Sequence, residues 1–225
     1  MNAHQRISLR ALALVWVLLQ AGCGTTSGPD RSVVETDTRT ALMTAAEKGN
    51  VDSLEDLLGS GGRINAMSPE GTPLYLAAAN GNTEVVWMLL RQGADPDRGL
   101  PGGTTPLMAA ASQGNKRIVD MLLAANATVE ARNDSGETAL SYAVLNSQLV
   151  VTKRLLRAGA EVNVVNEAGQ SLLMRVAARN DLLLAGVMVD ANADVAHKGP
   201  NGRTAFDVAQ ANGNRDLMIM LRNAR

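Results

Sequence analysis

The chain has 225 residues and a formal net charge of −1, and 46% of its residues are apolar while only 2% are aromatic. A nearly neutral chain with few rings lacks both the basic surface and the stacking side chains that nucleic-acid-binding proteins use. The composition therefore argues against nucleic acid as a partner.

The first predicted element is an apolar run from Ala11 to Leu19, which follows Arg6 and Arg10. This run of about ten residues is too short to cross a hydrocarbon core, which needs about 20 residues. Basic residues followed by a short apolar stretch are typical of a secretory signal peptide. We predict that residues 1–22 are a signal peptide.

The signal segment ends with the residues Leu19-Gln20-Ala21-Gly22-Cys23. This stretch is similar to the lipobox of bacterial lipoproteins, in which a pair of small residues precedes the cysteine that is acylated. The resemblance implies lipidation at Cys23, although Gln20 stands where the motif usually has leucine. Cys23 is the only cysteine, so no intramolecular disulfide can form, and acylation accounts for the single thiol of an exported chain. Conventional cleavage to a soluble periplasmic protein is the alternative.

A polar stretch follows the signal segment, and we predict that residues 23–36 are a flexible tether. Gly24 is not the aspartate that, by analogy with bacterial lipoproteins, retains such proteins at the inner membrane. The resemblance therefore implies an outer-membrane lipoprotein that faces the periplasm. In this interpretation the protein contacts the membrane only through its N-terminal lipid anchor.

Four features then recur at a constant offset from residue 37 to residue 225. A hydroxyl residue opens each unit at Thr40, Thr72, Thr105, Thr138, Ser171 and Thr204, with a spacing of 32 residues once and 33 residues four times. Paired apolar residues follow at 57–58, 89–90, 122–123, 155–156 and 188–189. Residues able to reach positive φ come next, at Gly61, Gly93, Asn126, Gly159 and Asn192. A glycine precedes each restart, at Gly71, Gly103, Gly136, Gly169 and Gly202.

Within the unit at 105–136, the local chemistry predicts two short antiparallel helices and a projecting loop. Thr105 is suited to the N-cap, and Pro106 to the first helical position, where its missing N–H would be unpaired anyway. Gly114 and Asn126 can end the two helices because both residue types tolerate the left-handed conformation. The apolar stripe of the second helix needs a neighbouring unit to cover it.

A period near 33 with T-P-L-x-x-A-A, G-N, V-x-x-L-L and a later glycine resembles ankyrin repeats. The resemblance covers about Asp37 to Arg225. It implies an all-α fold, an ankyrin-repeat solenoid of about six helix-turn-helix repeats with projecting hairpin loops. The histidine that this family usually has after T-P-L is replaced by Met43, Tyr75, Met108, Ser141, Met174 and Asp207. Ser147 and Asn180 replace the glycine after the first helix, so we expect repeats four and five to be the least regular.

No catalytic constellation is evident in the sequence. After removal of the signal segment His197 is the only histidine, so neither a Cys/His nucleophile pair nor a His/Cys metal site can be assembled. The glycine-rich stretch 99–103 lacks the following Lys-Ser/Thr of a phosphate-binding loop. Asp95 and Asp97 fall on loop columns of the repeat and need no catalytic role. We predict that the chain is not an enzyme and uses no cofactor, no metal and no small-molecule substrate.

The ankyrin resemblance implies that loop tips and exposed first-helix positions line a concave binding surface. The candidate partner-binding residues are Met67, Glu70, Tyr75, Asn80, Leu100, Gln113, Arg132, Asp134, Glu137, Asn146, Val165, Glu167, Arg179, Lys198 and Arg203. Each of them is also consistent with plain solvent-facing surface. We expect Met67 and Leu100 to be exposed apolar groups at loop tips, which suit an interface core. Tyr75 either fills the space of the missing histidine or reaches the concave face.

The preferred hypothesis is a protein-binding module of the bacterial cell envelope, acting as a scaffold or as an inhibitor of the immunity-protein kind. The alternative is an envelope structural or stress-protection factor with weak, multiple contacts. The charge is uneven, because residues 30–100 hold 11 acidic and 6 basic residues whereas residues 101–225 hold 11 acidic and 13 basic residues. Either a partner recognises this charge gradient, or the gradient is ordinary surface variation. The repeat pattern does not name the partner.

Overall fold

The computed structural model describes residues 31–224, and residues 36–225 form one compact unit. The α-helices of the described part are α1 (Arg31–Lys48), α2 (Val51–Gly59), α3 (Pro73–Ala79), α4 (Thr83–Arg91), α5 (Pro106–Gln113), α6 (Lys116–Ala124), α7 (Ala139–Leu145), α8 (Leu149–Arg157), α9 (Leu172–Ala178), α10 (Leu182–Asp190), α11 (Ala205–Ala211) and α12 (Arg215–Asn223). A short 3₁₀ helix, η1, spans Pro200–Gly202. Only two isolated β-bridges, and no β-strand, occur within residues 31–224.

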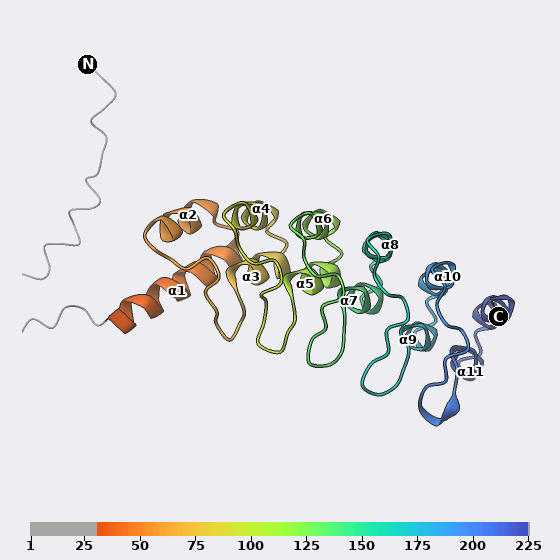
Figure 1. The fold of residues 1–225 in the computed structure, drawn as a ribbon. Helices are drawn as coiled ribbons and strands as arrows, with labels where there is room; N and C mark the ends of the chain where they lie inside the picture. The colour runs from red at the N-terminus through yellow and green to blue at the C-terminus, as the bar shows by residue number, and fades with distance from the viewer. Residues whose placement is uncertain (1–30, 225) are drawn as a thin grey trace, which may run out of the picture. The chain divides into compact units, whose positions relative to one another are not determined.

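The helices are arranged in two parallel rows (Figure 1). The odd-numbered helices form the inner layer, from which the long loops project, and the even-numbered helices form the outer layer. From α3 onward, each inner helix packs on the outer helix of its own repeat, and α3, α5, α7 and α9 also pack on the next inner helix. The described chain is therefore a helical solenoid, which confirms the predicted fold class.

The helix starts follow the sequence pattern in repeats two to six. In each, the hydroxyl of the opening Thr or Ser accepts a hydrogen bond from the backbone N–H three residues later. Repeat one differs, since Thr40 lies inside α1, which begins at Arg31, so the predicted helix start at Thr40 is wrong. No glycine precedes Thr40 to turn the chain, as Gly71 does before Thr72. Residues 31–36, which we predicted as the end of the tether, belong to α1.

The helix ends show why repeats four and five keep the same form as their neighbours. Ser147 and Asn180 each adopt a φ of +57°, close to the +71° of Gly114. The helices α7 and α9 have seven residues each, as α3 has, so the expected irregularity of these repeats is absent. A short polar side chain reaches the left-handed region at modest cost, and the Ser147 hydroxyl also lies 3.3 Å from a carboxylate oxygen of Asp181 in the next repeat.

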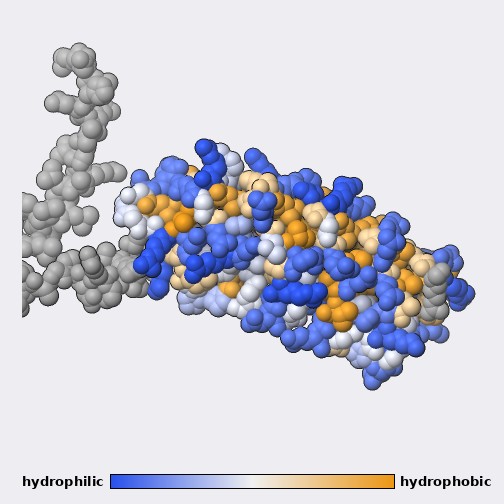
Figure 2. All heavy atoms as spheres, viewed as in Figure 1, coloured by the Kyte–Doolittle hydropathy of each residue, from blue (hydrophilic) through white to orange (hydrophobic). Residues whose placement is uncertain are grey.

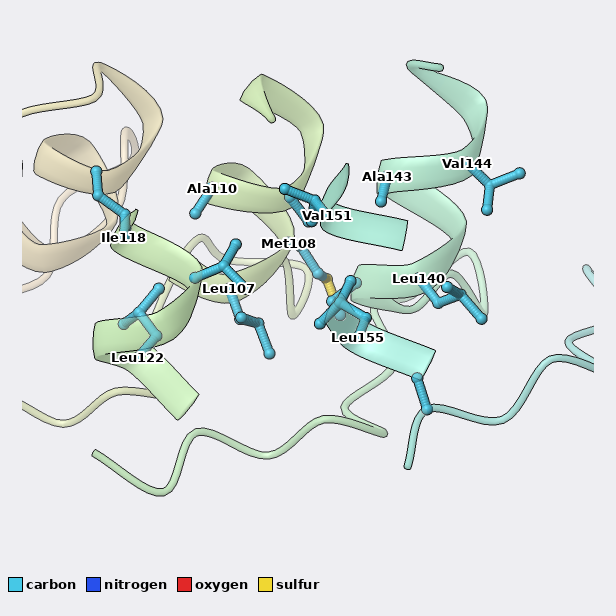
Figure 3. Close-up of a cluster of buried hydrophobic side chains, with 14 of the residues drawn as sticks. Leu107, Met108, Ala110, Ile118, Leu122, Leu140, Ala143, Val144, Val151 and Leu155 are labelled. Atoms are coloured by element: carbon cyan, nitrogen blue, oxygen red, sulfur yellow. The ribbon is translucent and has the colours of Figure 1, made fainter. Parts of the chain in front are cut away.

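The core consists of aliphatic side chains shared between repeats. In Figure 3 side chains from α5, α6, α7 and α8 meet in one cluster, in which Leu107, Ile118 and Leu155 are fully buried. Alanines such as Ala110 and Ala143 have small side chains that let the inner helices approach closely. Helices of seven to nine residues are too short to be stable alone in water. Their stability therefore comes from burial against the adjacent repeat.

One buried polar atom in this core has no hydrogen-bond partner. The Oγ1 atom of Thr152 in α8 is fully buried and unpaired. The equivalent positions of the two preceding repeats hold Val86 and Val119, both fully buried. Thr152→Val keeps the shape of the side chain and removes the unpaired hydroxyl, so we expect it to raise the free energy of unfolding by about 1 kcal/mol. Urea denaturation followed by circular dichroism measures this difference.

The matched control is Thr152→Ser, which retains the hydroxyl and deletes the methyl group. We expect this variant to be less stable than the parent chain, because it keeps the unpaired donor and opens a small cavity. A loss of stability in the valine variant would show that the hydroxyl is satisfied in solution.

Candidate functional site on the inner face

The loop-facing side of the inner layer, called here the inner face, carries two columns of side chains, of which the first differs from repeat to repeat and the second is mostly Asn or Gln. The fourth helical position contributes Leu76, Ala109, Tyr142, Arg175 and Val208. The position after each inner helix, or its last residue in α5, contributes Asn80, Gln113, Asn146, Arg179 and Asn212. The second column is exposed throughout, whereas the first is partly or largely buried. The inner face thus combines a semi-buried floor with an exposed polar edge.

Tyr142 lies near the middle of this floor and is held by the loop that precedes its helix. The side-chain nitrogen of Asn133 donates to the Tyr142 hydroxyl at 3.0 Å. The side-chain oxygen of Asn133 accepts from the backbone N–H groups of Ser135 and Glu137, each at 3.0 Å. One asparagine therefore shapes the turn and positions the tyrosine.

An ion pair next to Tyr142 connects two repeats. Nη1 of Arg175 in α9 lies 2.7 Å and 3.0 Å from the two carboxylate oxygens of Glu137, which is in the preceding loop. Their side chains are only 18% and 15% exposed. Partial removal from water strengthens such a charge-assisted bond. Glu137, which the sequence predicts as a partner-binding residue, is therefore largely committed to holding Arg175 in place.

Adjacent loops are also bonded to one another. The carboxylate of Asp97 accepts from the backbone N–H and the hydroxyl of Thr128 at 2.7 Å and 2.6 Å. The backbone N–H of Asp134 donates to the carbonyl oxygen of Gly102 at 2.9 Å. These bonds agree with the interpretation of Asp97 as a loop residue, and they join successive loops along the inner face.

The predicted partner-binding residues fall into two groups. The exposed group is Glu70, Asn80, Gln113, Arg132, Asp134, Asn146, Glu167, Arg179, Lys198 and Arg203. The half-buried group is Met67, Tyr75, Leu100, Glu137 and Val165. The expectation that Met67 and Leu100 are exposed apolar groups is therefore wrong. Successive loops lie against each other, so a side chain near one tip is partly covered.

Several exposed candidates interact with their own or the neighbouring repeat. Arg132 donates to the carbonyl oxygen of Gly136 within its own loop at 3.0 Å. Asn146 donates to the carbonyl oxygen of Tyr142 at 2.8 Å. Arg179 reaches the preceding repeat and donates to the carbonyl oxygen of Leu145. The structure brings Arg179 and Asn146 to the same edge, whereas Lys198 and Arg203 lie in the last loop.

Tyr75 fills space within its repeat. A Cβ atom at Gly71 would lie 2.7 Å from Cδ1 of the Tyr75 ring, so the ring packs directly on the glycine backbone. Burial raises the pKa of the Tyr75 hydroxyl, and Tyr142 adds to the rise. The ring thus fills space beside Gly71, and the side chain is only partly buried.

The sequence-based candidates did not include Tyr142 or Arg175. The sequence signal that could have identified them is the fourth helical position, which Tyr142 and Arg175 occupy in their repeats and Ala109 occupies in repeat three. A column that varies this much within a regular repeat is not required for the core. Among the described residues, no group of three or more His, Cys, Asp or Glu side chains is placed to bind a metal ion. No helix between residues 31 and 224 is both long and apolar enough to cross a bilayer.

Comparison with known proteins agrees with the stacked helix pairs. The chain matches the family described as ankyrin repeats (3 copies) over residues 4–99 and 97–166. The chain belongs to the ankyrin repeat family. Ankyrin repeats generally mediate protein–protein interaction, and their fold is a binding scaffold that is not typically enzymatic.

This ankyrin repeat protein is also similar to a solved structure, the crystal structure of the ankyrin repeat domain of Bcl-3, described as a unique member of the IkappaB protein family. The TM-score is 0.74 at 26% sequence identity, and the match covers 82% of this chain and 85% of that one. The likeness therefore extends over most of the array.

Three curated relatives share shorter segments with the chain. It is 40% identical over 67 residues to human BCL-6 corepressor-like protein 1, covering 29% of this chain and 4% of the relative. It is 38% identical over 81 residues to the 2-5A-dependent ribonuclease of Mus musculus, covering 35% and 11%. It is 47% identical over 60 residues to the mitochondrial disaggregase of Bos taurus, covering 26% and 9%. The matched segments thus make up a small part of each relative.

The ion pair on the inner face can be tested by a double-mutant cycle. Glu137→Gln leaves the partly buried Arg175 without its charge partner, so we expect the free energy of unfolding to fall by about 1 to 2 kcal/mol. The double variant Glu137→Gln/Arg175→Met should lose less than the sum of the single variants, with a coupling of about 1 kcal/mol. Urea denaturation of the four proteins measures the cycle.

Arg132→Met serves as the control, because Arg132 is exposed and bonds only within its own loop. We expect its effect to stay within about 0.5 kcal/mol. Additive effects of Glu137 and Arg175 would mean that the pair contributes nothing to joining the two repeats.

Proposed function

We propose that this ankyrin repeat protein is an exported, lipid-anchored module of the bacterial cell envelope that binds a periplasmic or envelope protein on its inner face. The observation that carries the proposal is the contrast between the two parts of each repeat. Core positions such as Leu107 and Leu140 repeat the same chemistry, whereas the first inner-face column changes from one repeat to the next. Variation on a surface that the core does not fix is what recognition of a particular partner requires.

The chemistry of the inner face is suited to a protein partner. Tyrosine and arginine are enriched at interface centres, and here Tyr142 and Arg175 are already fixed by Asn133 and Glu137. Side chains held in place before binding lose less conformational entropy on association. Exposed groups such as Gln113 supply the polar rim that surrounds such a centre.

Export and lipidation rest on the sequence, since Cys23 lies outside the described residues. The pattern Leu19-Gln20-Ala21-Gly22-Cys23 after a short apolar run supports them. A lipid on Cys23 would hold the repeat array at the membrane through residues 24–30 and leave the inner face available.

Partner binding can be tested by crosslinking in intact cells followed by mass spectrometry. The test variant is Gln113→Arg/Asn146→Arg, which adds bulk and charge to the exposed edge beside Tyr142 without touching Glu137 or Arg175. We expect at least a tenfold loss of the main crosslinked protein, because about 1.4 kcal/mol of lost binding energy suffices for that factor.

The control is Gln92→Arg/Asn223→Arg, which makes the same substitutions at exposed positions that end two outer helices. It should leave the set of crosslinked proteins unchanged. An unchanged set in the test variant as well would refute the assignment of the inner face. Titration then separates the two roles, since an inhibitor lowers its partner's activity and a scaffold leaves it intact.

The lipid anchor is tested by Cys23→Ser. We expect this variant to lose metabolic labelling with a fatty acid and to move from the membrane fraction to the soluble periplasmic fraction, because its acylated thiol is gone. Ser27→Cys in the Cys23→Ser background controls for the presence of a thiol and should not restore labelling. Retention in the membrane fraction without label would contradict the proposed anchor.

A further inference from the structure

The exposed apolar side chains of the described residues gather on the outer layer. The large hydrophobic residues that are exposed are Trp87, Val150, Leu182, Leu183 and Ile219, all on even-numbered helices. Figure 2 shows hydrophobic surface along this row of helices, between polar residues. The Arg91 guanidinium stacks on Trp87, 4.5 Å from the ring centre, and Trp87 is still 52% exposed. The remaining four residues lie on α8, α10 and α12.

The helix α10 is apolar on both of its sides. Its sequence, LLLAGVMVD, contains no charged residue before Asp190. A surface helix normally directs polar side chains outward, as α6 and α8 do. Leu184 and Met188 are buried in the core, whereas Leu183 is 71% exposed. Val150, at the equivalent position of α8, is 61% exposed, and α8 packs beside α10. We call Val150, Leu182, Leu183 and Ile219 the outer patch.

Basic residues lie on two helices of the outer patch, α8 and α12, and on the adjacent α6. The helices α6, α8, α10 and α12 carry seven Lys or Arg residues and three Asp residues. One of these acids, Asp120, is already engaged by Lys116 and Arg154, each at 2.6 Å. The exposed Arg117, Lys153, Arg157 and Arg215 have no carboxylate within salt-bridge distance among the described residues. By contrast, α2 and α4 carry one Arg and four acidic residues.

The fold does not require basic residues at the start of α6, whereas Arg157 lies in the last turn of α8, where the helix dipole favours a positive charge. Helix starts favour acidic side chains, and α2, α4 and α12 follow this preference with Asp52, Glu84 and Asp216. The first turns of α6, α8 and α10 contain no acid, and α6 begins with Lys116 and Arg117. Positive charge at a helix start opposes the helix dipole. The arrangement instead matches a surface that is negatively charged and can accept apolar side chains.

The sequence-based interpretation has the N-terminal lipid anchor as the only membrane contact; in its place, we propose that the outer faces of α6, α8, α10 and α12 also lie on an anionic phospholipid surface. The outer patch enters the headgroup region, and Arg117, Lys153, Arg157 and Arg215 contact lipid phosphates. Apolar anchors combined with a basic rim are what interfacial membrane binding uses. The inference rests on the proposed function, because a lipid on Cys23 would bring the array to the membrane. The outer layer would then face the lipid and the inner face would stay free for the protein partner.

The test uses residues 24–225, which contain the whole compact unit 36–225 and lack the cysteine. Vesicles of phosphatidylglycerol and phosphatidylethanolamine are compared with neutral phosphatidylcholine vesicles by co-sedimentation. We expect binding to the anionic vesicles that weakens as salt is added, and no measurable binding to the neutral vesicles.

Two variants probe the two parts of the surface. Lys153→Gln/Arg157→Gln should lower the partition coefficient on anionic vesicles about tenfold, since each basic residue near an anionic surface contributes a severalfold factor. Val150→Ser/Leu183→Ser should lower it by a similar factor by removing the apolar anchors. The control is Lys198→Gln/Arg203→Gln, which makes the same charge change on the last loop and should leave binding unaltered. Unchanged circular dichroism and urea midpoints show that each variant is folded.

Absent vesicle binding, or an equal loss in the control variant, overturns the inference. Sedimentation equilibrium without vesicles tests whether a second copy of the chain, in place of lipid, covers the outer patch. A dimer that Leu183→Ser abolishes would assign the outer patch to a second copy of the chain and also overturn it. These measurements involve neither the lipid anchor nor the protein partner, so their failure leaves the proposed function standing. A negative result with Cys23→Ser leaves the vesicle result unaffected.

Discussion

Burial of apolar side chains between neighbouring repeats is the constraint on which this molecule depends. Its repeat helices, of seven to nine residues, gain their stability by placing residues such as Leu107, Ile118 and Leu155 against the next unit. Stacking uses two opposite sides of each internal helix pair, one against the preceding repeat and one against the next. The two remaining sides are the inner face and the outer layer. They do not form the contacts between repeats, so their side chains can differ from repeat to repeat.

The two remaining sides have different chemistry. The inner face is polar and internally bonded, with Tyr142 held by Asn133 and Arg175 held by Glu137. The outer layer exposes Leu183, and its basic residues include Arg117 and Lys153, which have no carboxylate within salt-bridge distance among the described residues. The chemistry of the inner face is suited to a protein surface, and that of the outer layer is suited to an anionic lipid surface. Because the two faces lie on opposite layers of the solenoid, occupation of one leaves the other accessible.

The charge gradient of the chain is partly a property of the outer layer. Its acidic half includes α2 and α4, and its basic half includes α6, α8 and α12. Inner helices contribute less, since the Arg175 charge is matched by Glu137. A gradient that looks like general variation along the sequence is therefore concentrated on one layer of the solenoid.

Most of the fold could be predicted from local chemistry, because caps such as Thr105 and the positive φ of Asn126 depend only on residues a few positions away. The start of α1 was predicted wrongly, because the repeat pattern placed a helix start at Thr40, where no glycine turns the chain. For the inner face, the sequence predicted only which equivalent positions of successive repeats contribute to it. Its pairing of Glu137 with Arg175, 38 residues apart, depends on how adjacent repeats stack, as does the partial burial of Leu100. Such contacts arise from the distance between repeats in space, which no local pattern in the chain encodes.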